Sequence, residues 1–220
     1  MKADLHVHSC FSEDGHSTPE EILEKAKEIG FGCIAITDHN SFESFEKVKD
    51  FTDVIFVPGE EVGSADGHII ALGIDREIPK HLSIPKTIDL IHEAGGIAIA
   101  AHPYRWWTGL GEKNTRKYAD MFDGVEAKNA RSTKKHNDRS TDLADDIGKY
   151  ITAGSDSHRP HTIGGGYVEI PDDCRTWQDV IQAIREKKAV PFSSNRKVIA
   201  SLRYGLRSIF NWSKRGFHDM

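Results

Sequence analysis

The sequence has few cysteines, no long apolar run and no excess of basic residues. Its three cysteines, Cys10, Cys33 and Cys174, lie far apart without a C-x-x-C pair, which argues against a disulfide framework or a sulfur-ligated zinc site. The longest apolar block, around Ile97–Ala101, is far too short to span a bilayer. The formal net charge of −5 gives no global case for nucleic-acid binding. We therefore expect a soluble, cytoplasmic protein in which any anion-binding site is local.

Short runs of Ile, Val and Ala recur along the 220 residues, and each precedes a polar segment with helical spacing. This pattern predicts βα units on a parallel sheet within one α/β domain. Such a sheet can close into a barrel or stay open, and in both cases its ligand site lies at the C-terminal ends of the strands. The predicted strands are Ala3–His8, Cys33–Thr37, Val54–Val57, Ile69–Gly73, Ile97–Ala101, Gly124–Ala127 and Tyr150–Ala153.

Helix start and stop signals lie between these strands. Thr18-Pro19-Glu20-Glu21 combines an N-cap, a proline at the first helical position and a glutamate three residues after the cap, which predicts a helix ending at Gly30. Tyr104 to Arg116 has no regular pattern, so we expect a loop that carries Trp106 and Trp107 as a lid. Further helices are predicted over Ser41–Phe51, Ser83–Ala94, Ser132–Ile147 and Thr176–Lys187.

Histidine is the residue type that stands out, with 12 copies. His6 and His8 are two residues apart in a predicted strand, so their side chains leave one face and can converge on one ion. Asp14 follows in the next loop, from which an oxygen ligand can fold back toward them. Four other strand ends deliver similar residues, namely Asp38-His39, Glu60-Glu61, His102 and Asp156 with His158. Alone, each histidine is more often structural, but together they predict a metal cluster.

These motifs resemble those of the polymerase and histidinol phosphatase (PHP) domain family, which are an H-x-H with a following acid, a D-H, a G-x-E, an A-H-P-like segment and a D-x-H. The match runs from Asp4 to about Phe192. The resemblance implies a distorted (β/α)7 TIM-like barrel over residues 1–195. It also implies two to three divalent metal ions, for which Mn²⁺, Zn²⁺ and Fe²⁺ are all suitable.

Carried over position by position, the resemblance implies three sets of metal ligands. The first ion would be held by His6, His8 and Asp156, and Glu61 would bridge it to a second ion held by His102 and His68. The third set would be Asp14, His39 and His158, with Glu13 as an alternative to Asp14. Glu60 would not be a ligand. Among these residues, we expect Glu61, Asp156 and His102 to be catalytic.

A site of this kind suits a phosphate ester, because the ions leave it strongly positive. Two ions about 3.5–4 Å apart can lower the pKa of a bridging water and present hydroxide to phosphorus.

Asp4 and Asp38 lie next to proposed ligands in the sequence, and their carboxylates would suit acceptors that fix the tautomers of ligand histidines. A solvated surface position is an equal alternative for both acids. Glu126 and Asn129 resemble a further family segment on the rim, which assigns them no role. Candidates for holding the substrate's anionic groups are Arg105, Lys128, Arg131, Arg159 and His161.

The leading functional hypothesis is hydrolysis of a small-molecule phosphate ester of the nucleotide or sugar phosphate type. The alternatives are a nuclease acting on oligonucleotide ends, an inactive metal-binding accessory domain and an amidohydrolase. The segment 196–220 is basic, with apolar residues at helical spacing. We expect it to form an amphipathic helix on the barrel, and a nucleic-acid or membrane surface is the alternative partner.

Overall fold

A computed structural model describes residues 1–194 of the chain, and the basic segment 196–220 lies outside the described residues. Nine strands form one sheet in the order β7-β6-β5-β4-β3-β2-β1-β8-β9. β1, β2 and β3 are parallel to one another, as are β5, β6 and β7. These six strands are β1 (Lys2–Val7), β2 (Cys33–Ile36), β3 (Ile55–Ser64), β5 (Ile97–Ala100), β6 (Gly124–Asn129) and β7 (Tyr150–Gly154).

The two sides of the sheet meet where the chain leaves β7 and runs beside β1. The N–H of Asp156 donates to the carbonyl of His6 at 2.7 Å, and the N–H of His8 donates to the carbonyl of Ser157 at 2.8 Å. Gly154 makes this approach possible, because a Cβ at that position would lie 2.2 Å from the Cβ of His6. The sheet is therefore a nearly closed barrel, and the predicted distorted barrel is confirmed.

Among β1 to β7, one strand runs against the others, which the prediction of a parallel sheet did not include. β4 (Gly67–Leu72) forms a hairpin with β3 and is also antiparallel to β5. The predicted third strand ended at Val57, but β3 continues to Ser64 because β4 pairs with its second half, from Gly59 opposite Leu72 to Ser64 opposite Gly67. The reversal places the start of β4, with His68, at the same end of the barrel as Glu61.

Two short strands extend the sheet beyond β1 and were not predicted. β8 (Gly166–Glu169) is antiparallel to β1, and β9 (Val190–Ser193) is antiparallel to β8. Each has only four residues, and β9 contains Pro191, which removes a backbone donor. Short runs of this kind carry too little periodicity to separate them from loops.

The five predicted helices all form, with slightly narrower bounds. α1 (Pro19–Glu28) has the predicted capping box between Thr18 and Glu21. α4 (Gly111–Lys117) was not predicted and overlaps the segment expected to be irregular, because no side-chain cap or proline marks its start. A 3₁₀ turn, η1 (Pro160–Thr162), follows β7. The remaining helices are α2 (Glu43–Val48), α3 (Ile84–Glu93), α5 (Lys134–Asp146) and α6 (Trp177–Arg185).

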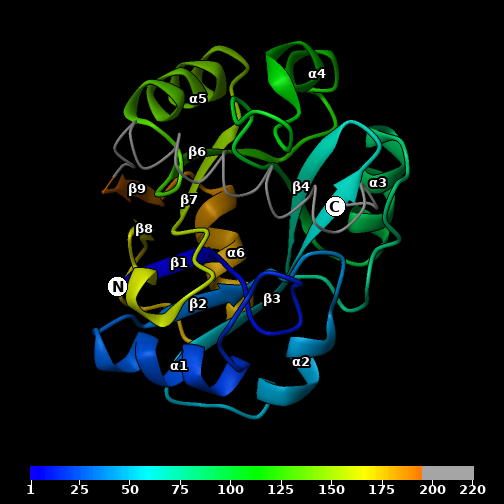
Figure 1. Ribbon diagram of the computed structural model, residues 1–220. Helices are drawn as coiled ribbons and strands as arrows, with labels where there is room; N and C mark the ends of the chain where they lie inside the picture. Colours follow the sequence, from blue (N-terminus) through cyan, green and yellow to red (C-terminus); the bar gives the residue numbers. More distant parts are fainter. Residues whose placement is uncertain (195–220) are drawn as a thin grey trace.

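The helices cover the barrel on opposite sides. Figure 1 shows α1 and α2 beside β2 and β3, with α4 and α5 at the opposite end of the molecule and α5 over β6. One apolar cluster draws residues from strands around the sheet, including Leu5, Val57 and Ile99, together with Val180 and Ile184 of α6. Packing α6 against the interior apolar residues leaves the opposite, C-terminal rim for polar side chains. Within residues 1–194, no helix has the length and apolar content needed to cross a membrane.

Candidate metal centre

Glu61 of β3 lies at the centre of a ring of imidazoles. Its carboxylate is buried, and both oxygens contact histidine nitrogens from four different parts of the barrel. Oε1 lies 2.8 Å from Nδ1 of His68 and 2.9 Å from Nε2 of His102. Oε2 lies 3.1 Å from Nε2 of His6, 3.2 Å from Nε2 of His8 and 3.2 Å from Nδ1 of His39. We call these six residues the donor cluster.

The other three predicted ligands lie beside the donor cluster. Nε2 of His158 is 3.0 Å from Oδ2 of Asp14, and Nδ1 of His158 is 3.6 Å from Oδ1 of Asp156. Asp156 also lies 3.7 Å from Nε2 of His8. The nine residues predicted from separate stretches of sequence therefore come together at one rim of the barrel.

A hydrogen-bond chain fixes which nitrogen of His8 faces the cluster. The hydroxyl of Ser12 donates to Oδ1 of Asp38 at 2.9 Å and accepts from the N–H of His39 at 2.9 Å. Since a serine hydroxyl has one proton, it must also accept from Nδ1 of His8, 3.1 Å away. Neutral His8 thus carries its proton on Nδ1, and its unprotonated Nε2 faces Glu61.

Glu126 of β6 does the same for His6. Its Oε1 lies 2.8 Å from Nδ1 of His6, and because a carboxylate only accepts, Nδ1 must be the donor. In a neutral His6, Nε2 is then the atom with the free lone pair. This Nε2 lies 3.1 Å from Nε2 of His8.

Within the donor cluster, hydrogen-bond acceptor atoms therefore face other acceptor atoms. Two imidazole lone pairs and a carboxylate oxygen converge within about 3.2 Å, which is repulsive unless a cation or a proton lies among them. Nδ1 of His102 is buried and has no hydrogen-bond partner among the described residues. Four sets of three donors each have ligand atoms within 4.8 Å of one another, and the residue types suit divalent metals.

The titration behaviour of the cluster fits the same chemistry. Burial lowers the pKa of His8 to about 4 and that of His39 to about 3, and it also lowers the pKa of His102. Burial opposes ionisation of Glu61 and Asp156, but the surrounding histidines and arginines outweigh it and hold both pKa values well below the usual range. Neutral imidazoles and ionised carboxylates are the forms that bind metal.

His6 is the exception to this titration pattern. Burial would lower its pKa, yet the carboxylates of Glu126, Glu61 and Asp156 raise it well above the ordinary value. These three acids concentrate negative potential on His6. A positive charge is therefore favoured at this position, whether it is a proton or a metal ion.

Three of the six non-glycine residues with positive φ in the described structure lie at the same rim. Asn40, His102 and Asp156 have φ angles of 50°, 25° and 52°, in a region that costs a non-glycine residue on the order of 1 kcal/mol. Each strained residue donates its backbone N–H to a residue of the centre: Asn40 to the carbonyl of Glu61, His102 to Oε2 of Glu126 and Asp156 to the carbonyl of His6. These φ angles belong to sharp turns of the chain that follow the strands, at the end of the barrel where the predicted metal ligands lie.

Two of the five predicted substrate-binding residues reach the centre. Nη2 of Arg105 lies 2.6 Å from Oδ2 of Asp156, and Nη1 of Arg131 lies 2.8 Å from Oδ1 of the same carboxylate. Nζ of Lys128 instead lies 3.7 Å from Oδ1 of Asp138 in α5. Arg159 and His161 are exposed on the loop at η1. A role for these last three in substrate binding stays a prediction.

The two acids expected to orient histidines differ in what they do. Asp38 acts on His8 through Ser12, as described above. Asp4 accepts backbone N–H groups of Ser155 and Gly164, both at 2.9 Å, and so joins β1 to the segment after β7. Burial raises the pKa of Asp4 to about 6. Asp4 therefore organises the backbone around the centre.

The residues that the sequence left without a role are Glu126, Asn129 and Ser12. Their contacts depend on neighbouring strands, since Glu126 meets His6 across 120 positions of sequence. A buried acid and a buried amide at the end of a predicted strand were the available signal, because such groups need partners.

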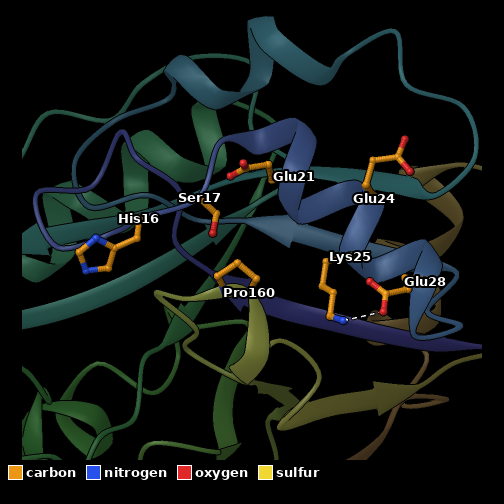
Figure 2. A pocket seen from close by; sticks show the side chains of 7 residues that line it. All are labelled: His16, Ser17, Glu21, Glu24, Lys25, Glu28 and Pro160. Carbon is orange, nitrogen blue, oxygen red and sulfur yellow. Dashed lines mark hydrogen bonds and ion pairs between the residues drawn. The ribbon is translucent and has the colours of Figure 1, made fainter.

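A surface hollow of about 540 Å³ lies outside the donor cluster, between α1 and the loop at Pro160. Figure 2 shows Glu21, Glu24 and Glu28 of α1 along it, with Lys25 paired to Glu28 at 2.9 Å. This acidic lining disfavours a phosphate anion.

Trp106 and Trp107, the expected lid residues, are 78% and 83% exposed on the loop after His102.

Comparison with known proteins gives two family matches. The PHP domain model matches residues 4–95, and the PHP-associated model matches residues 134–189. An uncharacterized protein of Methanocaldococcus jannaschii is 40% identical over 145 residues, which make up 59% of this chain and 82% of that protein.

Two solved structures share the fold at low sequence identity. A two-domain protein of Bacteroides vulgatus containing a predicted PHP-like metal-dependent phosphoesterase has a TM-score of 0.74 and 18% identity, over 88% of this chain and 64% of that chain. The lesion-specific endonuclease Q of Pyrococcus furiosus has a TM-score of 0.61 and 18% identity, over 84% of this chain and 56% of that chain. The chain thus spans less than two thirds of either protein. Together with the motifs and the barrel, the two family models show that the chain belongs to the PHP domain family.

Proposed function

We propose that the protein hydrolyses a small-molecule phosphate ester of the nucleotide or sugar phosphate type at the donor cluster. The observation that carries this proposal is the convergence of bare imidazole nitrogens and carboxylate oxygens around Glu61. Such a set of acceptors gains its stability from divalent cations, and the cations in turn favour an anionic substrate.

The proposed ligand assignment is the one that the family resemblance implies. His6, His8 and Asp156 would hold one ion, His68 and His102 a second, and Asp14, His39 and His158 a third. Glu61 contacts at least one histidine of each set and would bridge the first two. When bound, divalent ions lower the pKa of a coordinated water and neutralise charge on a phosphoryl group.

The protein's own groups would position the substrate around this centre. Arg105 and Arg131 contact the two oxygens of Asp156, so their guanidinium groups lie where they could donate to phosphoryl oxygens of a substrate at the cluster. Glu61, Asp156 and His102 are buried, and the backbone of His102 and Asp156 is also held in a strained conformation. Little movement is therefore needed to reach a reactive arrangement.

A nuclease acting on oligonucleotide ends is the second candidate. The observation that favours it is the exposed pair Trp106 and Trp107 on the loop after His102, because indole rings stack on bases without sequence preference. The endonuclease Q fold likeness agrees with this candidate. The negative net charge favours the small molecule, since a nucleic-acid groove is usually basic.

The test is phosphate release by purified protein loaded separately with Mn²⁺, Zn²⁺ or Fe²⁺. Substrates would be nucleoside monophosphates, sugar phosphates, short single-stranded oligonucleotides and amides. The proposal expects metal-dependent turnover of monophosphates. Turnover confined to oligonucleotides would select the nuclease, and metal binding without any turnover would indicate an accessory domain.

A further inference from the structure

Glu126 connects two residues of the donor cluster through the two oxygens of one carboxylate. Oε1 accepts from Nδ1 of His6 at 2.8 Å, and Oε2 accepts from the backbone N–H of His102 at 2.9 Å. The side chain is 1% exposed, so water cannot replace these contacts. The carboxylate therefore holds His6 of β1 against the strained turn at His102 after β5.

Asn129 extends this connection to Asp156. Its Nδ2 lies 3.1 Å from both oxygens of Glu126 and 3.1 Å from Oδ2 of Asp156. Its Oδ1 accepts from Nη2 of Arg105 at 2.7 Å and from the N–H of Arg131 at 2.9 Å. Because every neighbour of Oδ1 is a donor and every neighbour of Nδ2 an acceptor, the amide orientation is determined.

Asn137 of α5 keeps Asn129 in place. Oδ1 of Asn137 accepts from the backbone N–H of Asn129 at 3.0 Å, and Nδ2 of Asn137 donates to the backbone carbonyl of Asn129 at 3.0 Å. The β6–α5 unit thus presents Glu126 and Asn129 as a rigid pair, although neither residue was predicted to be a ligand.

We infer that Glu126 and Asn129 are positioning residues that prepare His6, His102 and Asp156 for metal. Glu126 selects the tautomer of His6 that leaves Nε2 free, and Asn129 orients Asp156 beside it. This inference rests on the proposed metal-dependent function. Partners of this kind typically change metal affinity by about ten- to a hundredfold when they are removed.

The role requires an acceptor at both oxygens, which gives a sharp test. A glutamine at this position has one acceptor and one donor, so whichever way its amide turns, an N–H faces either His6 Nδ1 or the N–H of His102. Glu126→Gln is therefore expected to weaken binding even though it preserves shape. Glu126→Asp keeps both acceptors on a shorter side chain and is expected to lose less affinity.

The experiment uses Zn²⁺ as the probe and the full chain. Competition titration with a chelator measures affinity and stoichiometry, and ¹⁵N-detected imidazole spectra of the zinc-loaded protein report the tautomer of His6. We expect Glu126→Gln to lower the affinity of at least one ion about ten- to a hundredfold, with Glu126→Asp intermediate. Glu186→Gln, the same change at an exposed helix end, is the matched control and should bind as the wild type does.

The outcomes separate this inference from the proposed function. A wild-type chain that binds no Zn²⁺ contradicts both. Binding by the wild type together with unchanged affinity and unchanged His6 tautomer in Glu126→Gln overturns the positioning role alone. If Glu126→Gln does not fold, Glu126→Asp and Asn129→Ala decide: wild-type affinity in both overturns the inference, and weakened binding by folded protein supports it.

Discussion

Two adjacent glutamates of β3 occupy opposite faces of the sheet and have opposite chemistry. Glu61 meets five imidazoles at the rim of the barrel, and its pKa is held well below the usual range despite burial. Glu60 faces the outer layer, where Val62 and Ile78 pack with α3. Its Oε2 accepts from the N–H of Ile78 at 2.9 Å, and its Oε1 has no partner among the described residues.

Burial raises the pKa of Glu60 to about 8, with Glu77 adding to the effect. The two side chains are equally buried and differ only in the direction that the strand gives them. Burial alone therefore does not distinguish the proposed metal ligand Glu61 from Glu60, whereas the face of β3 and the histidines gathered on it do.

Replacing the central carboxylate should have the largest effect. Glu61→Gln removes a negative charge that contacts all three ligand sets, and its amide places an N–H against imidazole nitrogens. We expect phosphate release to fall on the order of a thousandfold or more, with loss of at least one bound ion by elemental analysis. Near wild-type turnover in this variant would remove the basis of the comparison.

Removing metal should abolish activity on a protein that remains folded. A ligand that binds only the native state at 100 times its Kd stabilises by about 2.7 kcal/mol, so a chelator should lower the unfolding temperature as well. Adding back Mn²⁺ or Zn²⁺ should restore both the activity and the unfolding temperature. Activity that survives exhaustive chelation would contradict a metal-dependent mechanism.

The sequence predicted the members of the rim better than their geometry. His6, His8 and Glu61 follow from alternation and motif resemblance, because a strand with period two directs them to one side. The sequence could not show that β4 reverses, although this reversal brings His68 to Glu61. It also gave no account of Glu126, since contacts with His6 and His102 arise only when β6 packs beside other strands.

Substitution of Arg131 tests whether a guanidinium group beside the donor cluster contributes to substrate binding or turnover. Arg131 contacts Asp156 and lies 2.9 Å from Nδ1 of His158, so Arg131→Lys keeps the charge but loses the planar pair of donors. We expect kcat/KM for a monophosphate to fall roughly tenfold, about 1.4 kcal/mol, with metal content unchanged. A fall in bound metal of the same size would instead assign Arg131 to metal-site structure.

The exposed tryptophans should have a smaller effect that depends on substrate. Trp106→Ala and Trp107→Ala remove surfaces on which a base can stack, a contact that contributes about 1 kcal/mol or more. KM for a nucleoside monophosphate should rise roughly fivefold, while KM for a sugar phosphate stays constant. Equal changes for both substrates would show that the loop does not recognise a base.

Glu60→Gln is the closest control for the central prediction, because it makes the same substitution one residue away. We expect turnover and metal content to match the wild type, since the carboxylate of Glu60 makes no hydrogen bond or ion pair with the donor cluster in the described structure. Loss of activity comparable to that of Glu61→Gln would show that the two faces of β3 are not independent.

The same variant should change how stability depends on pH. Between the ordinary value of 4.5 and the folded pKa of about 8, folding protonates Glu60, so its contribution is full below pH 4.5 and is lost as pH rises toward 8. The loss is on the order of 1 kcal/mol per pH unit, and glutamine, which does not titrate, avoids it. The unfolding temperature of Glu60→Gln should therefore exceed that of the wild type by a margin that widens from pH 5 to pH 8. A constant margin would mean that Glu60 stays ionised in the folded protein, which would require a cationic or donor partner on the outer face of β3 and would remove the contrast with Glu61.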